Sequence, residues 1–172
     1  MSTVSVAGAW LINDNWTLRG GFGLILDGEM KTPDGVEHEV QPGGLVSAGV
    51  ERRVLVGNGW TPFMDLSLYL GASWTETLDP NTEIKTSYLA TDLRFGTRAG
   101  WNINGNTFPY AAVRIFGGPV NWELDGEDVT GADIHHYQIA LGTAVQLGPV
   151  ALYAEWAGVG EKAVSAGIST SW

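Results

Sequence analysis

Apolar and polar residues alternate with a period of two along most of this 172-residue chain, and no other feature restricts its fold as much. In residues 63–74, for example, Met64, Leu66 and Leu68 alternate with residues that are mostly small or polar. A period of two places neighbouring side chains on opposite faces of a β-strand, whereas a helix requires a period of 3.6 residues. The chain is therefore expected to be all-β.

The alternation divides the chain into nine segments, each of which we expect to be a strand. They cover residues 4–12, 16–26, 45–56, 63–74, 87–101, 107–117, 135–147, 150–158 and 163–172. Short connections with the Asn, Asp, Gly and Pro content of tight turns alternate strictly with longer polar connections, 27–43, 75–86, 118–134 and the shorter 159–162. This order predicts a single domain, residues 1–172, with an up-and-down antiparallel sheet whose tight turns all lie at one end.

Three properties of the segments favour a sheet that crosses a membrane over a sheet in water. Strands of ten or more residues match a tilted transmembrane strand and exceed the ~5–6 residues usual in globular sheets. The faces opposite the apolar ones carry glycine and few lysines. Aromatic residues gather at the strand ends: Trp10, Trp16, Trp60, Phe63, Trp101, Phe108 and Trp172 near the tight turns, and Trp74, Tyr88, Tyr137 and Trp156 near the longer connections. Two aromatic belts match the two interfaces of a bilayer, so we expect Leu66, Leu68, Leu93, Ile139 and Leu141 between them to face lipid.

The last segment, AVSAGISTSW (residues 163–172), alternates strictly and ends in an aromatic residue. With these features the chain resembles the small bacterial outer-membrane β-barrels of the OmpA-transmembrane-domain and opacity-protein type, as a pattern over nearly the whole chain and not as residue identity. The resemblance implies that Val164, Ala166, Ile168 and Trp172 form an assembly signal. Two positions depart from it: phenylalanine is the commoner last residue, and an aromatic residue is common where Thr170 stands.

The resemblance also implies a location and partners. The location is the bacterial outer membrane, with the tight turns in the periplasm, and the partners are outer-membrane lipid, lipopolysaccharide and the barrel-assembly machinery. Bacterial barrels of one chain have an even number of strands, whereas the pattern here gives nine. Eight strands are favoured and ten are the alternative. Either a first strand lies outside the sequence, or segment 2–12 or 163–172 pairs unusually.

The charged residues of the strands fall mainly on the expected inner face. These are Arg19, Arg53, Arg94, Arg98 and Arg114 against Glu51, Asp65, Asp92 and Glu155. The lumen of an eight-stranded barrel is just wide enough to be filled by side chains, and unpaired buried charges are costly. Nearly balanced arginines and carboxylates therefore predict a hydrogen-bonded network that plugs the lumen. The alternative is a charge cluster that determines selectivity in a narrow pore.

Composition excludes several kinds of function. The formal charge of −10 argues against nucleic acid as a partner, because phosphate binding needs a basic surface. The absence of cysteine excludes disulfides and thiolate chemistry. The acidic stretch ELDGEDVTGAD (residues 123–133) lacks the spacing of a calcium loop, and adjacent strand residues such as His135 and His136 point to opposite faces, which disfavours a shared metal.

No Ser–His–acid set is recognisable either, so no catalytic residue, cofactor or metal is expected. The sequence predicts a monomeric, non-enzymatic surface or structural barrel, or a narrow pore, with acidic extracellular loops. Two alternatives stay open, a lipid-modifying outer-membrane enzyme and a soluble lipocalin-like binding barrel. A catalytic constellation at the rim would favour the first, and an apolar lumen with a charged exterior would favour the second.

Overall fold

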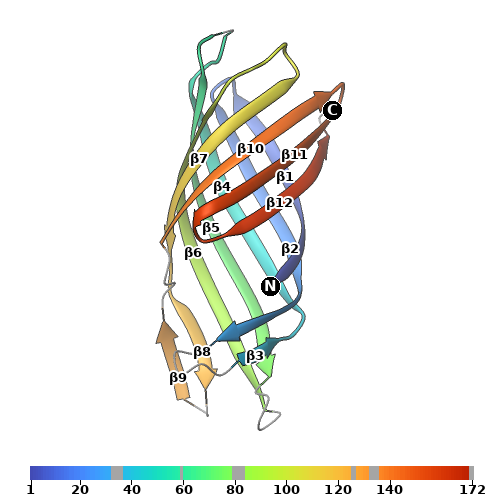
Figure 1. Ribbon diagram of the computed structural model, residues 1–172. Coiled ribbons are helices and arrows are strands. Elements are labelled where there is room, and N and C mark those ends of the chain that lie inside the picture. The colour runs from blue at the N-terminus through green and yellow to red at the C-terminus, as the bar shows by residue number, and fades with distance from the viewer. Residues whose placement is uncertain (32–36, 59, 79–83, 125–126, 132–135, 171–172) are drawn as a thin grey trace.

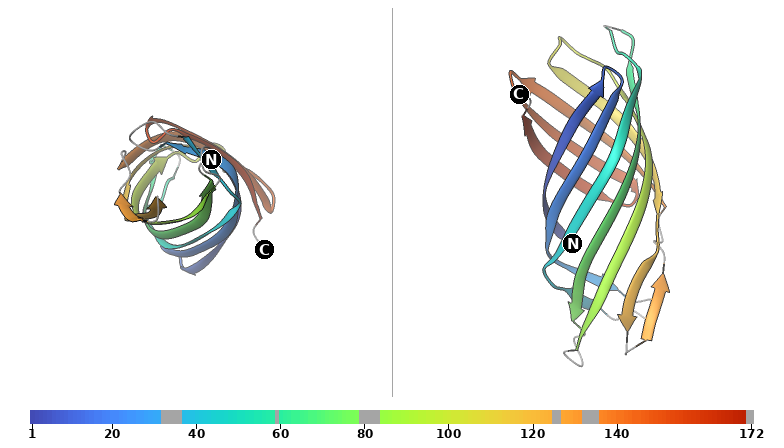
Figure 2. Two further views of the ribbon diagram at one scale, coloured as in Figure 1. Left: turned by 90° about the horizontal axis from the view of Figure 1, so that it is seen from below. Right: turned by 180° about the vertical axis from the view of Figure 1, so that it is seen from behind.

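The computed structural model is an antiparallel β-sheet that curls into a small barrel (Figures 1 and 2). It describes residues 1–31, 37–58, 60–78, 84–124, 127–131 and 136–170. The strands are β1 (Ser2–Asn13), β2 (Trp16–Lys31), β3 (Glu37–Val40), β4 (Gly43–Leu55), β5 (Phe63–Leu78), β6 (Lys85–Gly100), β7 (Thr107–Gly117), β8 (Val120–Leu124), β9 (Glu127–Gly131), β10 (Tyr137–Leu147), β11 (Val150–Gly160) and β12 (Ala163–Thr170). Within those ranges, no helix is long and apolar enough to cross a membrane. The all-β class and the antiparallel barrel are thus confirmed.

Nine long strands form the wall of the barrel, and each one pairs with the next wall strand along the chain. Their order is β1, β2, β4, β5, β6, β7, β10, β11 and β12. They correspond one to one with the nine segments of the alternation, with ends shifted by a few residues. The turn at Asn104 and Gly105 shows why the short connections were recognisable, since both residues have the positive φ that two-residue Asn-Gly turns require.

The strand count is neither of the two numbers expected from the sequence. The favoured eight and the alternative ten both assumed an even barrel, but no wall segment is skipped or split in the described residues, so nine remain. The terminal strands β1 and β12 both run from the end with the long connections towards the tight turns (Figures 1 and 2). They are therefore parallel to each other, and no pairing joins them in the part of the chain that the structure describes.

Three short strands, β3, β8 and β9, lie where only polar connections were expected. They extend the sheet beyond the wall at the end opposite the tight turns (Figure 1). His38 and Val40 of β3 are buried, and the Trp122 indole of β8 donates a 2.8 Å hydrogen bond to the hydroxyl of the fully buried Thr77. His38 and Trp122 also meet edge to face, with ring centroids 5.0 Å apart. This end of the barrel thus has a small core of its own.

The two faces of the wall differ as the alternation predicts. Leu68, Leu93, Ile139 and Leu141 point outwards and are between 40% and 58% exposed, while Leu66 on the same face is half-buried. The inner face carries most of the arginines and carboxylates of the wall, together with a few small buried residues such as Ala112, Ala140 and Ala157.

Inner-face tyrosines lie over glycines of the neighbouring strand at three places in the wall. The pairs are Tyr69 with Gly49, Tyr110 with Gly142 and Tyr153 with Gly167. A Cβ atom at any of these glycines would overlap the facing ring. The missing side chain thus makes room for each ring.

We therefore expect Gly142→Ala to lower the free energy of unfolding by about 1–3 kcal/mol, because overpacking would displace the Tyr110 ring. The measurement is a urea titration of the refolded barrel. Gly8→Ala is the control, because a Cβ at Gly8 meets no atom within 4 Å. Equal effects of the two changes would contradict the packing argument.

Candidate functional site: the polar interior

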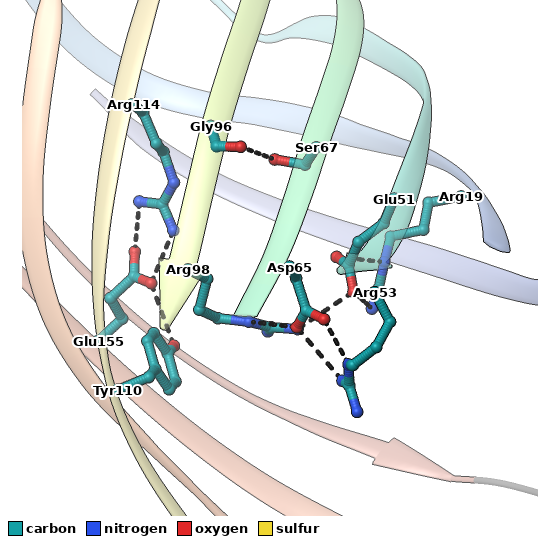
Figure 3. A network of polar contacts seen from close by, with 10 residues as sticks. All are labelled: Arg19, Glu51, Arg53, Asp65, Ser67, Gly96, Arg98, Tyr110, Arg114 and Glu155. Atoms are coloured by element: carbon teal, nitrogen blue, oxygen red, sulfur yellow. Dashed lines mark hydrogen bonds and ion pairs between the residues drawn. The ribbon is translucent and has the colours of Figure 1, made fainter. Parts of the chain in front are cut away.

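The interior of the barrel holds two clusters of charged side chains (Figure 3). In the first cluster Asp65 of β5 lies between two arginines. Arg53 Nε donates to Asp65 Oδ1 at 2.5 Å, and Arg98 Nη2 donates to Asp65 Oδ2 at 2.8 Å. Asp65 is only 2% exposed, so both arginines compensate a carboxylate that water hardly reaches.

Glu51 of β4 extends this cluster to a third arginine. Arg98 Nη2 donates to Glu51 Oε1 at 3.1 Å, and Arg19 Nη2 donates to the same oxygen at 3.3 Å. The side chain of Glu51 is 12% exposed, whereas the three arginines are 33–40% exposed. The carboxylates are therefore the buried partners, and the arginines reach from them towards the open space of the lumen.

The second cluster joins β7 to β10 and β11. Arg114 makes a bidentate pair with Glu155, with donor–acceptor distances of 2.6 and 2.7 Å. Tyr110 donates its hydroxyl to Glu155 Oε2 at 3.0 Å, and Arg114 Nη1 also donates to Gln138 Oε1 at 2.7 Å. The amide of Gln138 in turn donates to the carbonyl of Glu161 at 3.2 Å. This cluster is electrically neutral and its carboxylate is fully hydrogen-bonded.

Arg98 connects the two clusters. Its guanidinium carbon lies 5.4 Å from the centroid of the Tyr110 ring, which favours a cation–π contact. Arg98 also approaches the Phe63 ring at 6.0 Å, and Arg53 approaches the same ring at 5.3 Å. Side chains from β2, β4, β5, β6, β7, β10 and β11 thus meet in one connected interior network.

Two of the nine charged residues expected in the lumen stand apart from this network. Asp92 and Arg94 of β6 pair with each other at 3.2 Å, and their side chains are 34% and 38% exposed. Arg94 also lies over the Phe116 ring at 5.1 Å. The structure therefore brings seven of the nine residues together and leaves one separate, more open ion pair.

Two hollows accompany the charged residues. A cavity of about 170 Å³ lies on the tight-turn side of the network, and its walls include Arg53, Phe63, Arg98 and Tyr110. A larger and more open hollow of about 750 Å³ lies near the long connections, against Trp74, Glu76, Tyr88 and Glu123. Only the first hollow is bounded by the interior network.

Of the seven tryptophans expected in the belts, four lie close to the tight turns, Trp74 and Trp156 lie four residues from the ends of their strands, and Trp172 lies outside the described residues. Trp10, Trp16, Trp60 and Trp101 are 37–97% exposed near the tight turns, and Trp74 and Trp156 are 47% and 59% exposed towards the long connections. Arg52 lies over the Trp16 ring at 5.3 Å on the outer face. The prediction that Phe63 belongs to an aromatic belt is wrong, because its side chain is 7% exposed and points into the barrel. There its ring packs beneath the guanidinium groups of Arg53 and Arg98.

The residues expected to form the assembly signal are only partly described. Val164 and Ile168 are 81% and 71% exposed, and with Ala166 they share the outer face of β12 opposite Trp156, Leu152 and Ala154 of β11. Trp172 lies outside the described residues, as does His135.

The sequence analysis does not identify several interior residues that the structure places in polar contacts. Tyr110 and Gln138 belong to the network, where they hold Glu155 and Arg114, whereas His38, Thr77 and Trp122 form the separate small core at the other end. Tyr110, Gln138 and Thr77 lie at inward-facing positions of long strands, so the alternation could have found them. His38 and Trp122 lie in short strands where the alternation gives no such signal.

Among the residues that the structure describes, no group of three or more His, Cys, Asp or Glu side chains is placed to hold a metal ion. Ser87 donates to Glu123 at 3.3 Å in an exposed contact. No protein-family model, curated protein or solved structure matches the chain.

Proposed function

We propose that this chain is an integral outer-membrane β-barrel that acts as a non-enzymatic surface or structural protein, with an interior plugged by ion pairs. One observation carries the proposal: the wall presents its apolar side chains outwards and its charged side chains inwards. Phe22, Leu70, Ile115 and Leu141 on the outer face are between 57% and 65% exposed. Transmembrane barrels combine an apolar outer band with a polar interior.

The soluble lipocalin-like alternative requires the opposite distribution. A binding barrel in water keeps an apolar lumen and a charged exterior, because exposed apolar patches of this extent lead to association. Here Asp65 and Glu51 are among the best-buried charged side chains of the barrel, and the outer wall carries aliphatic and aromatic residues. The enzyme alternative receives no support from the hydrogen-bonded interior network.

The proposed lipid partners follow from the same outer face. Exposed tryptophans near both ends of the wall would lie at the two interfaces of a bilayer. The test is solubility: the refolded protein should require detergent or lipid and should migrate differently on gels before and after heating. A monodisperse, folded protein in plain buffer would overturn the proposal.

The outer face should also tolerate charge poorly. Leu68→Arg is expected to cost about 2–4 kcal/mol of folding free energy in lipid, because Leu68 lies near the middle of β5 on the outer face. Ser67→Arg, one residue away, should cost less, because Ser67 faces inwards and pairs with Glu51 across the ladder. Folding titrations into lipid vesicles measure both. A larger loss for Ser67→Arg would mean that the faces are reversed.

The plugged interior has a consequence for conductance. Because side chains from seven wall strands meet in the lumen, planar-bilayer recordings should show little or no steady current. A porin recorded in the same bilayer serves as the positive control. Stable, large channels at moderate voltage would contradict the prediction that the interior network blocks the lumen, and would favour the narrow-pore alternative.

A further inference from the structure

The two terminal strands of the sheet have free edges. β1 pairs only with β2, and β12 pairs only with β11, in the part of the chain that the structure describes. All twelve residues of β1 are exposed on both faces, and so are nearly all described side chains of β12. By contrast, the inner-face residues of β5 and β7 include buried side chains such as Asp65 and Ala112. Burial therefore decreases towards both unpaired edges, and we call the place where these two edges face each other without pairing the seam.

Strand direction determines what can fill the seam. β1 and β12 run the same way, so joining them directly would create a parallel pair in an otherwise antiparallel sheet. One further strand running in the opposite direction would pair antiparallel with both edges. It would also raise the number of wall strands from nine to the even number usual for bacterial barrels.

The side chains beside the seam specify the chemistry of that strand. On the inner face the flanking residues are small: Ser5 and Ala7 on β1, Ser165 and Gly167 on β12. On the outer face they are apolar, with Val6 62% exposed and Ile168 71% exposed. A strand that fits would carry apolar residues outwards and larger polar or aromatic residues inwards.

We propose that the seam is a strand-accepting site that binds one extended, alternating polypeptide segment antiparallel to both β1 and β12. The length of the segment is set by the 8 residues of β12 and the 12 residues of β1. The energetic drive rests on the proposed membrane location, because unpaired backbone N–H and C=O groups are very costly in hydrocarbon. Main-chain hydrogen bonds would supply affinity, and the alternating side chains would supply specificity.

Disulfide trapping tests this proposal, since the chain contains no cysteine. The probe is a synthetic peptide with the sequence of residues 150–160, which already pairs antiparallel with β12, and with Glu155→Cys at its inner-facing centre. It is added to the folded barrel carrying Ser5→Cys, Ser165→Cys or, as a matched control, Ser67→Cys. Ser67 also faces inwards, but β5 is paired along both edges. A peptide of scrambled sequence controls for composition.

We expect the peptide to cross-link to Ser5→Cys and Ser165→Cys with a yield several-fold above that for Ser67→Cys or the scrambled peptide. Equal yields at all three positions would show adsorption in the lumen and overturn the proposal. An intramolecular disulfide in the Ser5→Cys/Ser165→Cys double variant without peptide would show that the edges pair directly. Disulfide-linked dimers of the single variants would assign the seam to a second copy. The trapping is carried out in detergent and is read as a cross-linking yield, so its failure can be told apart from a failure of the solubility test above.

Discussion

Replacing Asp65 by alanine is expected to lower the free energy of unfolding by about 3 kcal/mol, which is the low end of the cost of breaking a buried ion pair from one side. Asp65 accepts hydrogen bonds from Arg53 and Arg98 and is 2% exposed. Without it Arg53 loses this carboxylate partner, and Arg98 keeps its hydrogen bond to Glu51. Urea unfolding of the barrel in lipid, followed by tryptophan fluorescence, measures the change.

Asp92→Ala is the matched control for this experiment. Asp92 also pairs with an arginine of the inner face, but its side chain is 34% exposed. Its removal should cost less than about 1 kcal/mol, as for other ion pairs open to solvent. If both aspartates proved equally important, burial would not be the property that makes the network stabilising.

Loss of Trp172 should have its largest effect on assembly in cells. Trp172→Ala, expressed with an export signal, is expected to insert poorly and to be degraded in the periplasm, because the resemblance to outer-membrane barrels implies that the terminal aromatic residue ends the recognition signal. In vitro, the same variant should fold nearly normally from urea into detergent, since a single aromatic side chain contributes little of the total burial. Membrane fractionation and a refolding titration measure the two effects.

Trp172→Phe is the control, because phenylalanine keeps an aromatic ring at the end of the chain and should restore insertion. Equal impairment in cells and in vitro would make Trp172 a structural anchor. Normal insertion of the alanine variant would remove the assembly role.

The alternation was sufficient to predict the wall strands and their faces, because successive residues of any β-strand point to opposite faces whatever the neighbouring strands are. The inner position of Arg98 follows from the outer position of Phe95 and from nothing else in the fold. Parity says nothing about which inner side chains touch, and for this reason the contact between Arg98 and Tyr110 was not predicted. That contact depends on how tightly the sheet curls.

The short strands escaped prediction for a different reason. β3 has four residues and β8 has five, and charged residues interrupt the apolar pattern in both. A period of two cannot be recognised over such a length. These short strands are stabilised by tertiary contacts between segments far apart in the sequence, such as the edge-to-face packing of His38 on Trp122. The strand count was wrong because evenness was taken from the protein class and not from the segments.

The interior ion pairs have a geometric consequence for the shape of the sheet. Arg98 of β6 reaches Glu51 of β4 across β5, and Arg114 of β7 reaches Glu155 of β11 across β10 (Figure 3). Each of these contacts spans an intervening strand, and inner-face side chains of strands two apart converge on the concave side of a curved sheet. Flattening the sheet would move the partners of both ion pairs apart and weaken the contacts. Side chains from the middle of the chain thus favour the curved form of the wall. They do so even though the terminal strands β1 and β12 are not paired with each other in the described residues.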